Sequence, residues 1–254
     1  MSTKRLLVAV LSLAGCAVAS PIGTLGIGSS GIVTATLTSI LFTTDAGVIG
    51  VCPGTACNGD VNSGTTLTFS GGPLVTNEGI LINNGLPIGT PPPAGAGFFN
   101  PFLQFANHPN LTFTLLGVNP GSSNTNCAGL TTGQSCSILE GGNVSPVVLT
   151  ASGSGSNVSI NLFGIASDGA GTSNWSGQFA ATIPDMTPLQ IVQFFCGADA
   201  SCSAGEIAAS PTLTVRSTSG SFFATAAVPE PSTTLMLGAG LILLSLTLRR
   251  YKVV

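Results

Sequence analysis

The sequence is short of charge. Charged residues make up only 6% of its 254 positions, and the formal net charge is −3. Between residues 20 and 228 the only basic residue is Arg216, against eight acidic ones, so this segment carries about −7. Nucleic acids and anionic membrane surfaces bind proteins through clustered lysine and arginine. The composition therefore argues against both as partners, and we expect no nucleic acid to bind.

Motifs for catalysis and metal binding are also scarce. The chain has one histidine, His108, in a polar loop, and it has neither a G-x-S-x-G nor a C-x-x-C motif. No spacing of acidic residues singles out a glycosidase pair. Residues 58–62 and 168–171 are oxygen-rich loops of the kind that bind Ca²⁺, although turn formation by Asp and Asn explains both. We expect no catalysis and no cofactor, with Ca²⁺ at these loops as the alternative.

Long apolar runs are confined to the two ends of the chain. Near the C-terminus, Leu235–Leu248 contains no charged residue, and Arg249, Arg250 and Lys252 follow at once. This run predicts a short transmembrane helix over residues 233–248. The three basic residues place the end of the chain in the cytoplasm by the positive-inside rule.

The N-terminal run predicts a secretory signal peptide over residues 1–19. Two basic residues precede the apolar stretch Leu6–Ala14, and small residues follow it. Cleavage after Ala19, at the end of an A-x-A triplet, makes Ser20 the first residue of the mature chain. The alternative is a lipobox that makes Cys16 a lipidated N-terminus. We favour the first, because an anchor at the opposite end makes lipidation redundant.

The C-terminal segment, residues 229–254, together with Val228 just before it, has three parts in a fixed order. They are the motif Val228, Pro229, Glu230 and Pro231, the apolar run, and the basic residues Arg249 and Arg250. This arrangement resembles a PEP-CTERM sorting signal of Gram-negative bacteria. The resemblance implies that a membrane-embedded exosortase recognises the tail and processes the protein for delivery to the cell surface or extracellular matrix. It covers about the last 27 residues and says little about the body.

The cysteines fit an exported protein. Apart from Cys16 there are six, and they fall into three close pairs: Cys52 and Cys57, Cys127 and Cys136, Cys196 and Cys202. Six cysteines allow 15 pairings, but proximity and the Gly/Asn/Ser loops between partners favour three local disulfides. Disulfides are expected in the periplasm or outside the cell.

Alternation with a period of two dominates the body. Val158, Ile160 and Leu162 share one face of a predicted strand, opposite Ser159 and Asn161. Similar alternation predicts strands at 31–42, 65–69, 111–118, 175–183, 211–217 and 220–227. These short strands, bounded by Gly/Asn/Ser turns, predict an all-β fold: an antiparallel β-sandwich, jelly-roll-like, with one short helix.

Particular segments give further expectations. Thr187, Pro at the first helical position and Gln190 predict a capped helix that runs to about Phe195. Residues 83–101, with three consecutive prolines, predict a long loop. Trp175, the only tryptophan, lies on the apolar face of its strand and is expected in the core, with sugar stacking as the alternative.

Together these features predict three parts: a signal peptide at 1–19, an extracytoplasmic body at 20–228 and a sorting signal at 229–254. The body is expected first in the periplasm, anchored in the cytoplasmic membrane, and then at the cell surface or in the matrix. Expected partners are a secretion translocon, an exosortase-type enzyme and exopolysaccharide. The alternative function is a secreted carbohydrate-binding or carbohydrate-active protein that carries the same tail.

Overall fold

A computed structural model describes most of the chain between Ser20 and Ala226. The described residues are 20–29, 32–43, 51–52, 55–83, 85–89, 94–153, 155–198, 201–215 and 218–226. The predicted signal peptide, its cleavage residue Ala19, and the chain from residue 227 onward lie outside them. The predicted division into three parts therefore stays a prediction.

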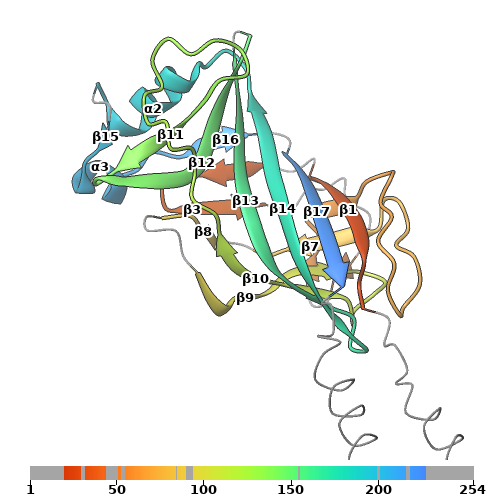
Figure 1. The fold of residues 1–254 in the computed structure, drawn as a ribbon. Helices are drawn as coiled ribbons and strands as arrows, with labels where there is room; N and C mark the ends of the chain where they lie inside the picture. Colours follow the sequence, from red (N-terminus) through yellow and green to blue (C-terminus); the bar gives the residue numbers. More distant parts are fainter. Residues whose placement is uncertain are drawn as a thin grey trace, which may run out of the picture.

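The largest sheet has 11 strands. In spatial order they are β10 (Thr112–Val118), β9 (Ala94–Phe105), β7 (Gly79–Ile82), β6 (Gly59–Val61), β1 (Gly23–Ser29), β17 (Thr218–Ala226), β14 (Thr172–Ile183), β13 (Gly155–Ser167), β12 (Asn143–Ser152), β11 (Ser135–Glu140) and β15 (Ser201–Cys202). Because β10 also pairs with β13, the strands from β10 to β13 close into a barrel-like sheet. The long strands β13 and β14 run from the end that carries α2 to the end that carries β9 and β10 (Figure 1).

A smaller sheet lies against the inner face of the large one. Its four strands are β16 (Leu213–Val215), β2 (Val33–Ala35), β3 (Ser39–Phe42) and β8 (Leu86–Pro87). The Phe42 ring of β3 lies 5.2 Å from the Phe179 ring of β14, which joins the two sheets through their buried side chains. A separate pair consists of β4 (Val51–Cys52) and β5 (Thr55–Ala56).

Two helices cover the end of the large sheet near β11 and β15. Helix α2 (Pro188–Cys196) begins at Thr187, whose hydroxyl and the Gln190 side chain form the predicted capping box. Helix α3 (Ala204–Ala208) begins with a second capping box, between Ser203 and Glu206. Neither these helices nor any other part of the described chain forms a helix long and apolar enough to cross a membrane.

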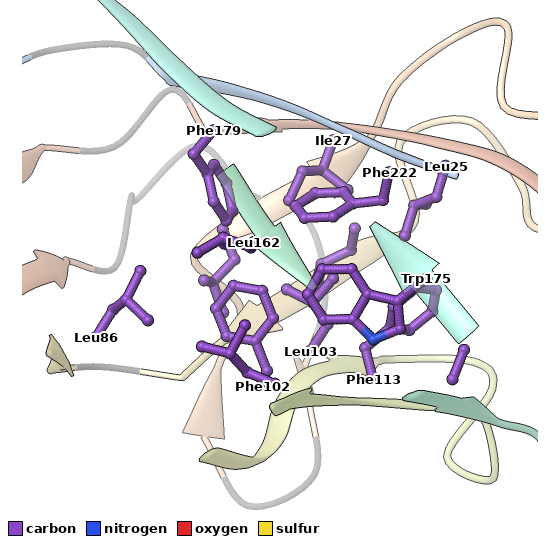
Figure 2. Close-up of a cluster of buried hydrophobic side chains, with 14 of the residues drawn as sticks. Leu25, Ile27, Leu86, Phe102, Leu103, Phe113, Leu162, Trp175, Phe179 and Phe222 are labelled. Carbon is purple, nitrogen blue, oxygen red and sulfur yellow. The ribbon is translucent and has the colours of Figure 1, made fainter. Parts of the chain in front are cut away.

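Trp175 belongs to an aromatic core that also contains Phe102, Phe113 and Phe222 (Figure 2). It is 2% exposed, and its ring is nearly parallel to that of Phe102, with centroids 5.9 Å apart. Its indole Nε1–H donates to the carbonyl oxygen of Thr114 at 3.2 Å. Gly164 makes this packing possible, because a Cβ there would lie 1.9 Å from that same oxygen. The predicted core position of Trp175 is confirmed.

The mostly β, antiparallel body and the predicted α2 are confirmed, but three segments differ from expectation. The predicted strand 65–69 forms only an isolated bridge, between Thr68 and Ile22. Residues 31–42 form two strands, β2 and β3, and Leu41, predicted to face inward with Val33, is 43% exposed. The hydroxyl of Thr36 accepts the backbone N–H of Ser39 and turns the chain between them. The predicted loop 83–101 contains β8 and the first half of β9. The finer description as a sandwich stays a prediction, since the large sheet closes on itself.

Candidate functional site

The three predicted disulfides are present. Their Cα–Cα distances are 5.2 Å for Cys52–Cys57, 5.3 Å for Cys127–Cys136 and 4.5 Å for Cys196–Cys202. All six side chains are buried. Each bridge joins cysteines fewer than ten positions apart and so stabilises local structure rather than joining distant parts of the chain. The pairing fits an oxidising compartment.

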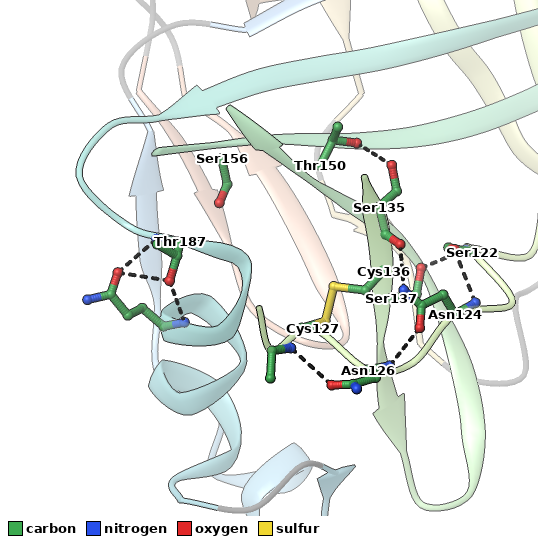
Figure 3. Close-up of a disulfide and its surroundings, with 12 residues drawn as sticks. Ser122, Asn124, Asn126, Cys127, Ser135, Cys136, Ser137, Thr150, Ser156 and Thr187 are labelled. Atoms are coloured by element: carbon green, nitrogen blue, oxygen red, sulfur yellow. Dashed lines mark hydrogen bonds between the residues drawn. A yellow bond between two sulfur atoms is a disulfide. The ribbon is translucent and has the colours of Figure 1, made fainter. Parts of the chain in front are cut away.

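The loop beside Cys127 is shaped by asparagine side chains (Figure 3). The Asn124 Oδ1 accepts the backbone N–H of Asn126, whose own Oδ1 accepts the N–H of Ala128, both at 3.0 Å. The Asn124 amide also donates to the carbonyl oxygen of Ser135 at 2.9 Å. These polar groups serve the turn that leads to the disulfide.

His108, which the sequence placed in a polar loop, is engaged by a buried carboxylate. Its Nδ1 lies 2.9 Å from Oε1 and 3.0 Å from Oε2 of Glu78. The Glu78 side chain is 0% exposed and that of His108 17%. Glu78 also accepts the backbone N–H of Asn107 at 3.0 Å, and the Phe69 ring meets the imidazole edge-on. The pair therefore joins the β9–β10 loop to the chain before β7.

Asp168 holds two loops together at the turn between β13 and β14. Its carboxylate accepts the backbone N–H groups of Ser70 at 2.7 Å, Gly171 at 2.8 Å and Ala170 at 3.0 Å. Burial by itself raises the pKa of this carboxyl, but the hydrogen bonds together outweigh it, so the pKa lies below its usual value. The Asp168 carboxylate oxygens thus support the turn by accepting three backbone N–H groups. This is the turn-forming role that the sequence suggested for loop 168–171.

This carboxylate gives a pH-dependent stability. Because the pKa of Asp168 is lower in the folded state, its contribution is complete above the unfolded-state value of about 3.9 and is lost as the pH falls through the folded-state value. Asp168→Asn should cost about 1 kcal/mol near pH 6 and progressively less below pH about 4. Denaturant unfolding across this range measures the difference. Asp185→Asn, in an exposed turn, is the control, and a cost that persists unchanged at pH about 2 would contradict the assignment.

The second oxygen-rich loop, residues 58–62, is also used by the fold. Asn58 is buried; its amide donates to the carbonyl oxygen of Ile82 at 2.7 Å and its Oδ1 accepts the Ile82 N–H at 2.6 Å. Burial raises the pKa of Asp60, against an opposing hydrogen bond from its own backbone. Among the described residues no three His, Cys, Asp or Glu side chains gather as metal ligands. Ca²⁺ binding at this loop stays an untested alternative.

An apolar cavity of about 80 Å³ lies between the two sheets and α2. Val33 and Phe42 of the small sheet, Ile160 and Phe179 of the large sheet, and Phe195 of α2 contribute to its walls. Its lining in the described structure contains no titratable side chain. Among the described residues this cavity therefore offers apolar space without ionisable groups.

The outward side of β13, β14 and β17 carries a group of polar, uncharged side chains. In register, Asn161 lies opposite Gln178, and Gln178 lies opposite Ser221. The Gln178 Nε2 donates to the Asn161 Oδ1 at 3.2 Å, and Thr182 donates to the Asn157 Oδ1 at 3.0 Å. No sequence motif groups these residues. The alternating pattern of each strand indicates that these residues face outward, but only the register between strands shows that they lie together.

The two ends of the described chain lie side by side. Strand β1 pairs with β17 so that Gly23 lies opposite Ala224. Ser20, the predicted first residue of the mature protein, therefore lies near the end from which the C-terminal segment departs after Ala226.

The family model of the PEP-CTERM protein-sorting motif matches residues 227–250. The chain carries a PEP-CTERM sorting motif. No curated protein and no solved structure matches the chain. The PEP-CTERM match includes the predicted processing residues Val228, Pro229, Glu230 and Pro231 and the basic residues Arg249 and Arg250. Lys252 follows the matched segment, and all of these residues lie outside the described structure.

Proposed function

We propose that the chain is an exported protein that an exosortase-type enzyme processes at Val228–Pro231, which delivers the body to the cell surface or extracellular matrix. The PEP-CTERM motif carries this proposal. Before processing, a helix at 233–248 anchors the chain in the cytoplasmic membrane, with the body in the periplasm and Arg249 and Arg250 in the cytoplasm. Three disulfides in the body support an extracytoplasmic location.

The body acts without catalysis in this proposal. The side chains considered as catalytic or Ca²⁺-binding candidates form hydrogen bonds within the fold. His108 contacts Glu78, Asp168 accepts backbone N–H groups, and Asn58 bonds Ile82. The alternative, a carbohydrate-binding body with the same tail, is supported by the uncharged amide and hydroxyl side chains on the outward side of β13, β14 and β17.

The sorting step is tested by changing the motif and leaving the apolar run intact. Insertion needs apolar length, whereas a processing enzyme must read side chains. The double variant Pro229→Ala/Glu230→Ala should therefore insert normally and accumulate unprocessed in the membrane, with almost complete loss of the processed form. Mass spectrometry of secreted and membrane fractions measures both forms in the native host.

The matched control is Thr233→Ala/Thr234→Ala, which alters two nearby residues outside the Pro-Glu-Pro motif. It should be processed like the unaltered chain. Normal release of the Pro229→Ala/Glu230→Ala protein would refute sorting through this motif and reduce residues 233–248 to an ordinary anchor.

A further inference from the structure

A group of polar side chains lies on the outward surface of β13, β14 and β17, and we call this group the polar face. It is made by Asn157, Asn161, Gln178, Thr182, Ser219 and Ser221. All of these side chains are exposed or half-buried, and their places in the register put them on one side of three paired strands. Neighbouring strands lie about 4.8 Å apart, so each strand offers a polar group within reach of the next.

The polar face is hollowed at two places along β14. One shallow depression of about 430 Å³ is lined by Asn161, Gln178 and Ser221, together with Asn119 beyond β10. A second, of about 140 Å³, is lined by Asn157, Thr182 and Ser219 with their neighbours. From Gln178 to Thr182 the strand rises by about 3.4 Å per residue, so the two depressions follow each other along the strand. This arrangement suits a ligand with repeated units.

Aromatic side chains lie next to the larger depression. Phe223 is 52% exposed, and the register places Ser176 opposite both Phe223 and Phe163. This row adjoins the row of Asn161, because outward side chains alternate along each strand. A flat apolar ring beside hydrogen-bonding groups is the combination that binds a ligand with an apolar face and a polar rim.

The chemistry of the polar face selects among ligands. Amides and hydroxyls supply both donors and acceptors, and Gln178 is held toward Asn161 by their 3.2 Å hydrogen bond. None of the six side chains is charged, and between residues 20 and 228 the only basic residue is Arg216. Phosphorylated, sulfated or uronic-acid polymers would meet an acidic protein without cationic partners. Neutral sugars match both properties, because their hydroxyls donate and accept while their ring C–H groups are apolar.

We propose that the polar face binds a neutral polysaccharide, with Asn161, Gln178 and Ser221 hydrogen-bonding one sugar unit and Phe223 packing on an adjacent one. Asn157, Thr182 and Ser219 contact units farther along the chain. Because these groups lie on long paired strands, they are positioned before the ligand arrives. The inference rests on the proposed function only for the location of the protein, at the cell surface or in the matrix, where it would meet the polysaccharide. Binding itself does not require tail processing.

Affinity electrophoresis of the purified, disulfide-bonded full chain in detergent micelles tests this site. The probes are three neutral polysaccharides, dextran, galactomannan and xyloglucan, and the acidic polymer alginate. At least one neutral polymer should retard migration, and alginate should not. Gln178→Ala and Phe223→Ala should each weaken binding about tenfold through loss of a hydrogen bond or a ring contact. Gln178→Glu, which keeps the shape but adds charge, should weaken it at least as much.

Thr214→Ala, an exposed change on β16 of the small sheet, is the matched control and should bind like the unaltered chain. Thermal unfolding must show that each variant keeps its fold.

Three results would overturn the proposal: no retardation by any of the three neutral polymers, retardation by alginate alone, or binding by the Gln178→Ala protein that equals that of the unaltered chain. Phe223-dependent binding of the detergent-free, tail-processed protein to phosphatidylcholine vesicles, without polysaccharide binding, would assign the face to a membrane. Failure of sorting in the Pro229→Ala/Glu230→Ala protein would leave the binding result unaffected.

Discussion

Replacing Trp175 by alanine is expected to lower the free energy of unfolding by about 3–5 kcal/mol. The indole is 2% exposed and stacks on Phe102, while Phe113 and Phe222 meet it at tilted or edge-on angles with centroids 5.7 and 5.4 Å away. Alanine removes these contacts and leaves a cavity that rigid paired strands cannot close. It also removes the donor to Thr114. Urea unfolding with the disulfides intact measures the change.

Phe223→Ala is the control for this prediction, because it removes an aromatic ring from the exposed side of β17. It should change the free energy of unfolding by no more than about 0.5 kcal/mol. A similar loss of stability in both variants would mean that the buried Trp175 ring stabilises the fold no more than an exposed ring does. If Phe223→Ala leaves the free energy of unfolding nearly unchanged, any loss of polysaccharide binding in this variant does not result from unfolding.

Local features were predicted correctly because neighbouring residues determine them. Each cysteine pair is closed by partners fewer than ten positions apart, and the capping box of α2 needs only Thr187 and Gln190. Helix α3 was missed although Ser203 and Glu206 provide the same signal. Its five residues are too few for a helical pattern to stand out in the sequence.

The errors arose where a side chain or a bulge interrupts regular alternation. Thr36 continues the pattern of 31–42, yet its hydroxyl accepts backbone N–H groups and turns the chain there. The loop predicted at 83–101 rested on three consecutive prolines, which lie outside the described residues. The last part of this segment, up to Pro101, lies in β9, where the partners of Phe113 and Leu115 in β10 jump from Leu103 to Phe99. Proline is tolerated in strands at such bulges.

Closure of the large sheet and assembly of the polar face depend on contacts between distant residues. The pairing of β10 with β13 places Phe113 opposite Ala166, and no local pattern specifies that register. Asn161 and Gln178 are each ordinary outward residues of alternating strands. Only the β13–β14 register puts them opposite each other, so the sequence could indicate polar strand faces but not a shared site.

Replacing Asn58 by leucine is expected to lower the free energy of unfolding by about 3 kcal/mol. The Asn58 side chain bonds both backbone groups of Ile82, with its amide as donor and its Oδ1 as acceptor, and its amide also reaches the carbonyl oxygen of Phe42 at 3.3 Å. It thus links β7 to β3. Leucine has similar volume but leaves the buried N–H and C=O of Ile82 without this partner, which costs about 1–3 kcal/mol for each group.

Asn110→Leu is the matched control, because it makes the same chemical change at an exposed position before β10. It should alter the free energy of unfolding by no more than about 0.5 kcal/mol. Urea unfolding of both proteins without added metal gives the comparison, and a repeat with Ca²⁺ separates the two interpretations of loop 58–62. If Asn58 serves the backbone, Ca²⁺ should leave the difference between the variants unchanged. Stabilisation of the unaltered chain by Ca²⁺ that Asn58→Leu abolishes would instead show that this side chain ligates the ion.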